Sequence, residues 1–290
     1  MMANATILVT GSGGQLGQEF RHLASVRTDR SFVFVSRDEL DIADAGAVGG
    51  LFRKHQPSCC INCAAYTAVD RAEQEPEEAF RVNATAVDLL AQACRSTGAR
   101  FIHFSTDYVF DGQGREPYRE EDPTHPLGVY GASKLQGEQR ALAACPDSLV
   151  IRTSWVYSPY GRNFVKTMLR LQRERSEIGV VHDQLGSPTY AADLAEATLS
   201  ILEAPAWHPG LFHYCNEGVI SWFDLAVAIG ELAHTGCRVR PIETRDYPTP
   251  ARRPAYSALD TSRIRQVFGI RPPAWRASLA RCLRRLEPAL

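Results

Sequence analysis

Short runs of apolar, β-branched residues alternate with helical patterns along the first half of the chain. The predicted strands are Thr6–Thr10, Phe32–Val35, Ser58–Cys63, Arg100–Ser105 and Ser148–Arg152. Helical patterns begin near Leu16 and cover Ala43–His55, Pro76–Thr97 and the segment that holds Tyr130 and Lys134. Strands that alternate with helices form a parallel sheet wrapped by helices. We therefore predict an α/β fold with a Rossmann-type, doubly wound parallel sheet.

From Ser158 onward the pattern loosens, with more turns and fewer clean strand–helix units. The helical patterns here are Asn163–Glu174, Ala191–Glu203, Trp222–Ala233, Ser262–Phe268 and Trp275–Leu286. We predict a dinucleotide-binding domain over residues 1–157 and a smaller, irregular, mainly substrate-binding domain over 158–290, with later segments returning to the first. The proline- and arginine-rich stretch Asp246–Ala255 is predicted to be a loop over a site or a linker.

Composition narrows the class of protein. The 290 residues are 44% hydrophobic and 22% charged, with a formal net charge of −1, which favours a soluble globular enzyme and neither nucleic acid nor membrane as a partner. The first strand begins too early for a signal peptide, and scattered cysteines in apolar runs favour a cytoplasmic location. Cys60 and Cys63 spell Cys-x-x-Cys, a redox or zinc pattern, although a buried strand explains them as well.

A glycine-rich turn follows the first predicted strand. Gly11-Ser-Gly-Gly14-Gln15-Leu16-Gly17 opens a helix, and glycines there permit a tight turn and close approach of the backbone to a pyrophosphate. The helix N-terminus then supplies N–H groups to the phosphates. The second strand ends in Ser36-Arg37, followed by Asp38 and Asp41. Arg37 can receive a 2′-phosphate, which favours NADPH, although the nearby acidic residues keep NADH open. The alternative is that Arg37 is an exposed loop arginine without this role.

Tyr130 and Lys134 lie four residues apart in Tyr-Gly-Ala-Ser-Lys, in a chain with three lysines. On a helix these positions share a face, so the ammonium can approach the phenol and lower the phenol pKa. Such a phenol can exchange a proton near neutral pH. The alternative is an amphipathic helix with an unrelated surface lysine.

Further polar residues follow predicted strands at the edge where ligands bind in open α/β sheets. Thr106 can polarise a carbonyl, and Asp107 can orient a substrate or cap a turn. Trp155 can stack on a sugar or belong to the core. Later loops add polar and cationic residues suited to a diphosphate or nucleotide: Asn163, Gln184, Arg252 and Arg253.

Several motifs in order resemble the extended short-chain dehydrogenase/reductases, and within them the dTDP-4-dehydrorhamnose reductase family. These motifs are Gly11–Gly17, Asn62–Glu73, Ser105–Gly112, Tyr130–Lys134, Arg152–Trp155, Gly186–Thr189 and Arg253–Ser257. The resemblance covers nearly the whole chain. It implies NAD(P)H-dependent reduction of the C4 keto group of dTDP-4-dehydro-6-deoxy-L-mannose to dTDP-L-rhamnose.

The resemblance also implies residue roles. Tyr130 is the acid that protonates the C4 oxygen, Lys134 holds the nicotinamide ribose, and Thr106 completes the triad. Asp107, Trp155, Asn163 and Arg253 are then substrate residues. The cofactor residues are Gly11, Gly14, Gln15, Leu16, Arg37, Asp41, Ile42, Ala64, Ala65 and Tyr66, together with Tyr130 and Lys134.

The sequence also bears on a magnesium site and on alternative functions. Some members dimerise around magnesium, and Glu19 matches one such position. A full ligand set cannot be matched, so no metal residues are assigned and dependence on magnesium stays open. A homodimer is compatible with the resemblance. A nucleotide-sugar epimerase or dehydratase is a rival on the same fold, but Tyr108 stands where dehydratases place a glutamate. A non-catalytic NADP-binding regulatory subunit is a further rival.

Overall fold

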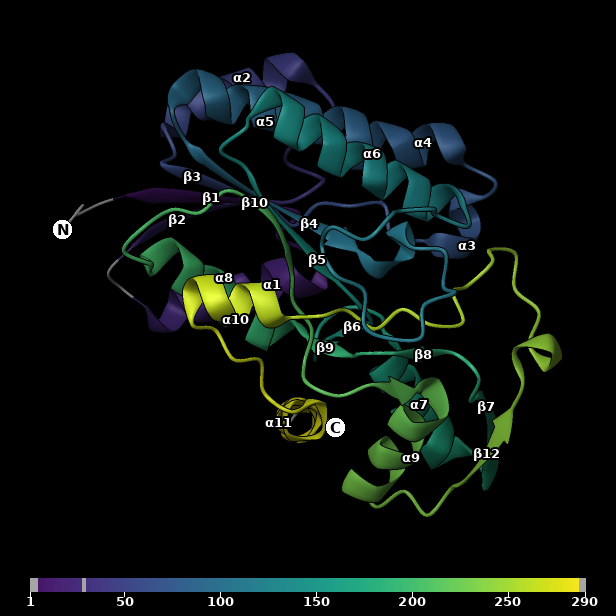
Figure 1. The fold of residues 1–290 in the computed structure, drawn as a ribbon. Coiled ribbons are helices and arrows are strands. Elements are labelled where there is room, and N and C mark those ends of the chain that lie inside the picture. Colours follow the sequence, from purple (N-terminus) through teal and green to yellow (C-terminus); the bar gives the residue numbers. More distant parts are fainter. Residues whose placement is uncertain (1–4, 28–29, 287–290) are drawn as a thin grey trace.

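A six-stranded parallel sheet forms the centre of the computed structural model, which describes residues 5–27 and 30–286 (Figure 1). Its spatial order is β10 (Gly210–His213), β5 (Leu149–Thr153), β4 (Arg100–Thr106), β3 (Cys59–Asn62), β1 (Thr6–Thr10) and β2 (Ser31–Val35). The chain passes outward from β1 to β2 and then returns across β1 to β3. The carboxyl ends of β1 and β3 are therefore the switch point where such sheets bind ligands. This sheet confirms the predicted Rossmann-type fold.

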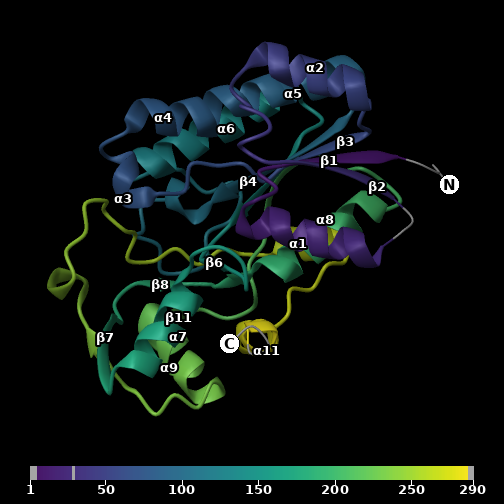
Figure 2. The same cartoon turned by 180° about the vertical axis from the view of Figure 1, so that it is seen from behind.

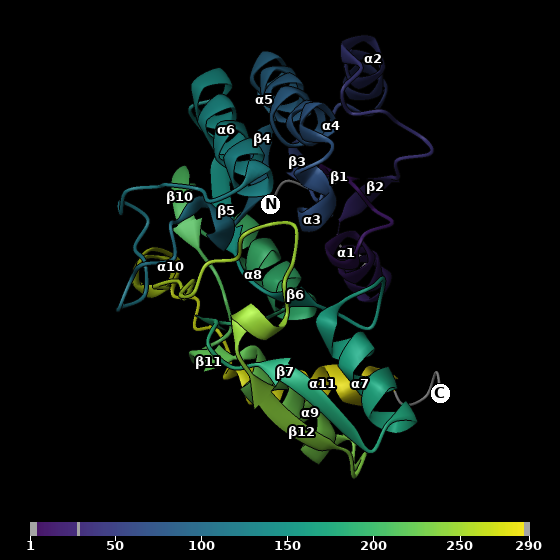
Figure 3. The same ribbon diagram turned by 90° about the vertical axis from the view of Figure 1, so that its right-hand side faces the viewer.

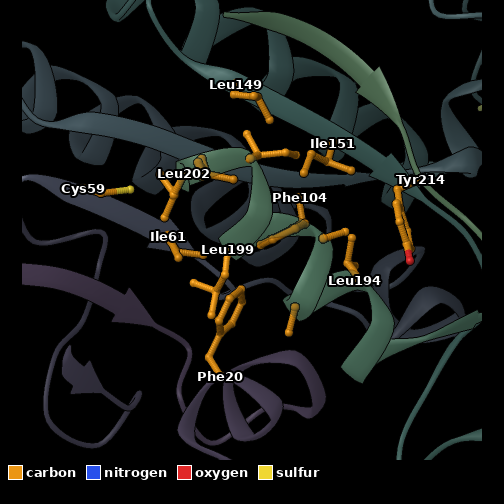
Figure 4. Packing of buried hydrophobic residues seen from close by; sticks show 14 of the residues in the cluster. Phe20, Cys59, Ile61, Phe104, Leu149, Ile151, Leu194, Leu199, Leu202 and Tyr214 are labelled. Atoms are coloured by element: carbon orange, nitrogen blue, oxygen red, sulfur yellow. The ribbon is translucent and has the colours of Figure 1, made fainter. Parts of the chain in front are cut away.

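Helices cover both faces of the sheet, as Figures 1 and 3 show. One face carries α1 (Gln15–Val26), α8 (Ala191–Glu203) and α10 (Ser262–Phe268), and the other carries α2 (Ala45–His55), α5 (Ala86–Thr97) and α6 (Val129–Ala144). Successive residues of β1 point to opposite faces, so Ile7 and Val9 join the first core and Leu8 joins the second. Figure 4 shows the first core, where Phe20 of α1 and Leu199 of α8 meet residues of the sheet.

The helix predicted over Pro76–Thr97 is interrupted. It consists of α4 (Pro76–Phe80), a π-helical turn η1 (Arg81–Thr85) and α5. A π turn adds a residue to one helical turn without changing which residue types are favoured, so the apolar pattern does not reveal it. The extra residue turns the buried side chain of Asn83 toward the loop after β3, where it bonds the backbone of Tyr66.

The second half of the chain adds a lobe beside the carboxyl edge of the sheet (Figure 2). Its helices, all within predicted segments, are α7 (Phe164–Glu174), α9 (Trp222–Leu232) and α11 (Trp275–Leu286). Three two-stranded sheets pair β6 (Val156–Tyr157) with β9 (Thr189–Tyr190), β8 (Leu185–Gly186) with β11 (Ile220–Ser221), and β7 (Glu177–Val181) with β12 (Arg238–Ile242). Short helical turns elsewhere are α3 (Val69–Ala72), η2 (Asp107–Val109) and η3 (Thr244–Asp246).

The predicted loop Asp246–Ala255 is tied to the sheet edge. The N–H group of Ala251 donates to Asp70 of α3, and Pro254 lies so close to Gly112 that a Cβ there would come within 2.6 Å of it. This segment therefore packs over the loop that follows β4. Among the described residues, no helix is both long and apolar enough to cross a membrane.

A buried ion pair joins α6 to the sheet. Arg152 of β5 donates two hydrogen bonds to the Glu138 carboxylate, at 2.9 and 2.8 Å, and each side chain is 4% exposed. The guanidinium also lies over the ring of Phe110, 5.0 Å from its centroid. Since α6 carries Tyr130 and Lys134, this pair helps to fix the helix on which both residues lie.

We expect Arg152→Met to lower the free energy of unfolding by about 3–5 kcal/mol, because Glu138 would remain buried without its partner. Urea unfolding measures the change. Removal of both charges in Glu138→Leu/Arg152→Met should recover most of the loss. The exposed pair of Arg170 and Glu174 provides a control: Arg170→Met should change stability by less than about 1 kcal/mol. A double variant no more stable than Arg152→Met would contradict this account.

Candidate active site at the carboxyl edge of the sheet

The glycine-rich turn connects β1 to α1 at the switch point. Gly11 has a φ of 63°, and a Cβ there would lie 2.4 Å from the backbone nitrogen of Ala64. Only glycine lets the turn after β1 approach the chain after β3 so closely. Gly14 caps α1, whose first turn has neither a capping side chain nor an acidic residue. The N–H groups of that turn are therefore available to an anion.

A cavity of about 240 Å³ opens beside this turn. Its lining includes most of the predicted cofactor residues: Gly11, Gly14, Arg37, Asp41, Ile42, Ala64, Ala65 and Tyr66. The remaining lining residues are Gly13, Ser36, Leu40, Cys63, Arg81 and Val82. Backbone N–H groups at one end and guanidinium groups at the other suit a ligand with several phosphates.

Charge at the β2 end of the cavity is arranged around Arg81. Its Nη1 donates to both Asp41 oxygens, at 3.0 and 2.8 Å. The N–H group of Ala43 and this guanidinium together lower the pKa of Asp41. Arg37 is less constrained, because its side chain is 86% exposed and its Nη2 lies 3.7 Å from Glu78. Arg81 was not among the predicted site residues, because the helical pattern did not reveal the π turn that carries it.

Two predicted cofactor residues, Gln15 and Leu16, do not line this cavity. The Gln15 amide oxygen accepts a hydrogen bond from Asn163 at 2.8 Å, and Leu16 packs against the core of the sheet. Asn163 also caps α7 through a bond from the N–H of Lys166. The first helix is thus joined to the second half of the chain directly below the glycine turn.

Asn83 connects the cavity to α6. Its side chain accepts from the Tyr66 N–H at 2.8 Å and donates to the Tyr66 carbonyl at 3.0 Å. It also donates to Ser133 Oγ, which in turn donates to the Tyr130 carbonyl at 2.8 Å. This chain of bonds fixes the cavity wall relative to the turn that carries Tyr130. A polar residue inside an otherwise apolar helical pattern was the signal available in the sequence.

Lys134 is buried inside the protein, and Tyr130 is half-buried. Burial raises the pKa of Tyr130 to about 12, with a hydrogen bond involving Thr106 acting in the opposite direction. The Lys134 amine contacts the carbonyl oxygen of Phe104 at 2.6 Å and His103 Nε2 at 3.3 Å. Burial lowers the pKa of Lys134 to about 8. The expected lowering of the phenol pKa is therefore not found, because desolvation outweighs the effect of a nearby cation.

The start of α6 is held by a carboxylate from the loop after β3. Glu73 accepts a hydrogen bond from the N–H of Val129, at 2.8 Å, next to Tyr130. The capping residue Gly128 has no side chain of its own to supply this bond. Glu73 thus provides both an acceptor and a negative charge for the positive end of the helix.

Thr106 is the last residue of β4, and Asp107 follows it. Thr106 Oγ1 lies 3.0 Å from Asp107 Oδ1 and accepts from the N–H of Tyr108. Asp107 is 2% exposed. Burial raises its pKa to about 6, although hydrogen bonds from Ser257 and Thr106 oppose the shift. The Tyr108 and Tyr130 rings meet edge to face, with centroids 5.6 Å apart.

Trp155 has a backbone conformation that bulky residues rarely adopt, with a φ of 49°. Its indole stacks on Trp222 at a centroid distance of 3.5 Å. On another side, a Cβ at Gly186 would approach the indole to 2.7 Å. A strained and half-buried aromatic residue at the sheet edge is typical of a ligand contact.

The remaining candidates are spread around this edge. Arg253 pairs with Asp70 through two bonds, at 3.0 and 2.9 Å, while Gln184 bonds Thr244 and Arg252 is exposed. All eight cysteines are free, and burial holds the pKa of the Cys63 thiol well above its usual value, so this structure contains no reactive thiolate there. Glu19 accepts from Arg285 at 2.8 Å, and the described residues include no group of three metal-ligating side chains.

Comparison with known proteins agrees with this architecture. The family model described as "RmlD substrate binding domain" matches residues 5–287. A dTDP-4-dehydrorhamnose reductase of Aggregatibacter actinomycetemcomitans is 42% identical over 95% of this chain and 97% of its own. The crystal structures of two such reductases, from Clostridium acetobutylicum and, in complex with NADP, from Bacillus anthracis, are 38% and 36% identical. Each has a TM-score of 0.94 and covers 97% of this chain and 99% of its own. The chain therefore belongs to the RmlD substrate binding domain family.

Proposed function

We propose that this protein is a reductase that uses NADPH to convert the C4 keto group of dTDP-4-dehydro-6-deoxy-L-mannose into the hydroxyl of dTDP-L-rhamnose. Such a reaction belongs to the biosynthesis of deoxysugars for cell-surface polysaccharides. The observation that carries the proposal is that Tyr130, Lys134 and Thr106 are gathered at the same sheet edge as a glycine-lined cavity. The names of the similar reductases support the same substrate.

Different side chains of the protein would donate the proton and bind the ligands. Tyr130 would donate a proton to the C4 oxygen, and Thr106, through its bond to the phenol, would stabilise the phenolate left behind. Lys134 would bind the nicotinamide ribose. Trp155 would pack on the deoxysugar, and Asp107, Asn163 and Arg253 would orient the nucleotide sugar. When bound, the reduced nicotinamide supplies the hydride.

Two arginines favour NADPH over NADH as the cofactor. Arg37 and Arg81 both line the cavity, and the Asp41 carboxylate is already bonded to Arg81. A carboxylate in that bond is less available to ribose hydroxyls, whereas the exposed Arg37 guanidinium, which makes only a long 3.7 Å pair with Glu78, can turn to meet a 2′-phosphate. The reductase from Bacillus anthracis was crystallised with NADP.

The rival functions fit less well. A dehydratase would need a glutamate where the half-buried Tyr108 stands, and desolvation raises the pKa of that phenol. A regulatory subunit would not need the Tyr130, Lys134 and Thr106 arrangement. The free cysteines support a reducing, cytoplasmic location. A homodimer stays a prediction, which analytical ultracentrifugation checks.

The proposal is tested by following the near-ultraviolet absorbance of reduced nicotinamide while dTDP-4-dehydro-6-deoxy-L-mannose is added. We expect Tyr130→Phe to lower kcat by about 10²–10⁴-fold, because the general acid is lost. Tyr157→Phe is the matched control, since its buried hydroxyl has no partner among the described residues. Full activity of Tyr130→Phe would remove the proposed acid, and a lack of substrate-dependent oxidation in the unaltered protein would favour the regulatory subunit.

Cofactor preference is tested at Arg37. We expect Arg37→Ala to lower the ratio of kcat/KM for NADPH to that for NADH by about tenfold, because one charge-assisted contact to the 2′-phosphate is lost. Arg170→Ala, an exposed arginine on α7, should leave the ratio unchanged. An unchanged ratio in both variants would show that Arg37 does not read the 2′-phosphate.

We expect the buried carboxylate of Asp107 to lower the stability of the folded protein. Its pKa of about 6, against a usual 3.8, means that the charged form is disfavoured in the folded protein. Above about pH 6, Asp107→Asn should therefore raise the free energy of unfolding by on the order of 2–3 kcal/mol, and this gain should vanish below about pH 4. At the same time KM for the sugar nucleotide should rise.

Urea unfolding at several pH values measures the effect. The control is Asp111→Asn, because backbone and Tyr118 hydrogen bonds lower the pKa of Asp111, so its loss should not stabilise the protein at neutral pH. A gain for Asp107→Asn that is equally large at low pH would contradict a charge-based cause.

A further inference from the structure

A row of buried polar residues crosses the sheet beneath α6. Thr10, Asn62 and His103 are paired in register on the neighbouring strands β1, β3 and β4. None of the three is more than 1% exposed, and their neighbours two residues earlier, Leu8, Cys60 and Phe101, belong to the apolar core on that face. The row ends at Lys134, which is itself 2% exposed. The hydrogen bonds along this row determine which atom donates and which accepts in each pair.

The orientation of Asn62 follows from its partners. The N–H of Ala64 donates to Asn62 Oδ1 at 3.1 Å, and Thr10 Oγ1 lies 2.7 Å from the same oxygen. A backbone N–H can only donate, so this atom must be the amide oxygen. The amide nitrogen of Asn62 therefore faces His103 Nδ1, at 3.1 Å.

The orientation of Asn62 sets the tautomer of His103. An amide nitrogen only donates, so Nδ1 of the ring must accept, and a neutral ring then carries its proton on Nε2. The ring is neutral, because burial and the charge of Lys134 hold its pKa well below the usual value. The Nε2–H group therefore points at the Lys134 nitrogen, 3.3 Å away.

The surroundings of Lys134 disfavour its ammonium form relative to that of a lysine in water. An ammonium group has three N–H donors and no lone pair, yet the Phe104 carbonyl is the one acceptor within hydrogen-bond distance among the described residues. A neutral amine can instead accept from His103 and donate to Phe104. The titratable groups that act on Lys134 are His103 of β4 and Glu138 of α6. Glu138 favours the ammonium, but its carboxylate is already paired with Arg152.

We propose that His103 is a positioning residue for Lys134: its ring, oriented by Asn62, directs Nε2–H at the lysine nitrogen, which weakens the hold of that amine on its third proton and keeps the amine directed at the Phe104 carbonyl. The importance of this amine rests on the proposed reductase function. The arrangement itself does not, because every group in it belongs to the protein.

The tautomer is tested by NMR on protein with ¹⁵N-labelled histidine, in the absence of cofactor and substrate. The His103 resonances are assigned by their loss in His103→Phe. We expect a neutral ring with its proton on Nε2 throughout the range from about pH 6 to about pH 9. A proton on Nδ1, or an imidazolium in that range, would overturn the proposal even if the protein proves to be an active reductase.

The effect on the amine is measured by ¹³Cε labelling of lysine, which gives few signals because the chain has three lysines. Lys134 should titrate near pH 8, and the midpoint should rise by about one unit or more in His103→Phe and in Asn62→Asp, where a carboxylate moves the ring proton to Nδ1. Thr10→Val is the matched control: Ala64 still orients Asn62, so the midpoint should not move. Equal midpoints in the unaltered protein and His103→Phe would refute the role of His103.

Discussion

Two glycines of α6 determine how closely this helix approaches its neighbours. A Cβ on Gly131 would lie 2.1 Å from the Tyr108 carbonyl, and one on Gly137 would lie 2.0 Å from the Asn83 carbonyl. Any larger residue would push the helix away from both the turn after β4 and the π turn. The contact of Lys134 with the Phe104 carbonyl depends on this close approach. The packing of α6 therefore decides whether the site exists.

Close packing also sets the electrostatic character of the site. Burial raises the pKa of Asp107 and Tyr130 and lowers that of Lys134, so in each case it opposes the charged form. Charges are instead concentrated where partners satisfy them, as in the pair of Arg152 and Glu138 and in the bonds of Arg81 to Asp41. Low charge beside the keto sugar and high charge beside the phosphates are what the proposed ligands require.

Much of this arrangement could be predicted from local pattern. The glycine turn, the alternating strands and helices of the first half and most residues of the cavity follow from patterns and motifs whose parts are close in sequence. The features that were not predicted depend on contacts between distant segments or on local backbone conformation. The strands β7, β10 and β12 are short or charged and pair only with distant segments. Arg81 and Asn83 reach the site through a π turn, and His103 acts through partners on other strands. Spacing along a helix also could not reveal that burial would dominate the pKa of Tyr130.

The edge strand β10 has a consequence for synthesis on the ribosome. Strands β1 to β5 are complete once residue 153 has been translated, but β10 comes from residues 210–213, and α8 and α10, which cover the face that carries Leu149 and Ile151, come later than β5 as well. A nascent chain of intermediate length therefore exposes both an unpaired strand edge and an apolar face. During that interval the growing polypeptide is vulnerable to aggregation and is a natural client for chaperones that bind emerging chains.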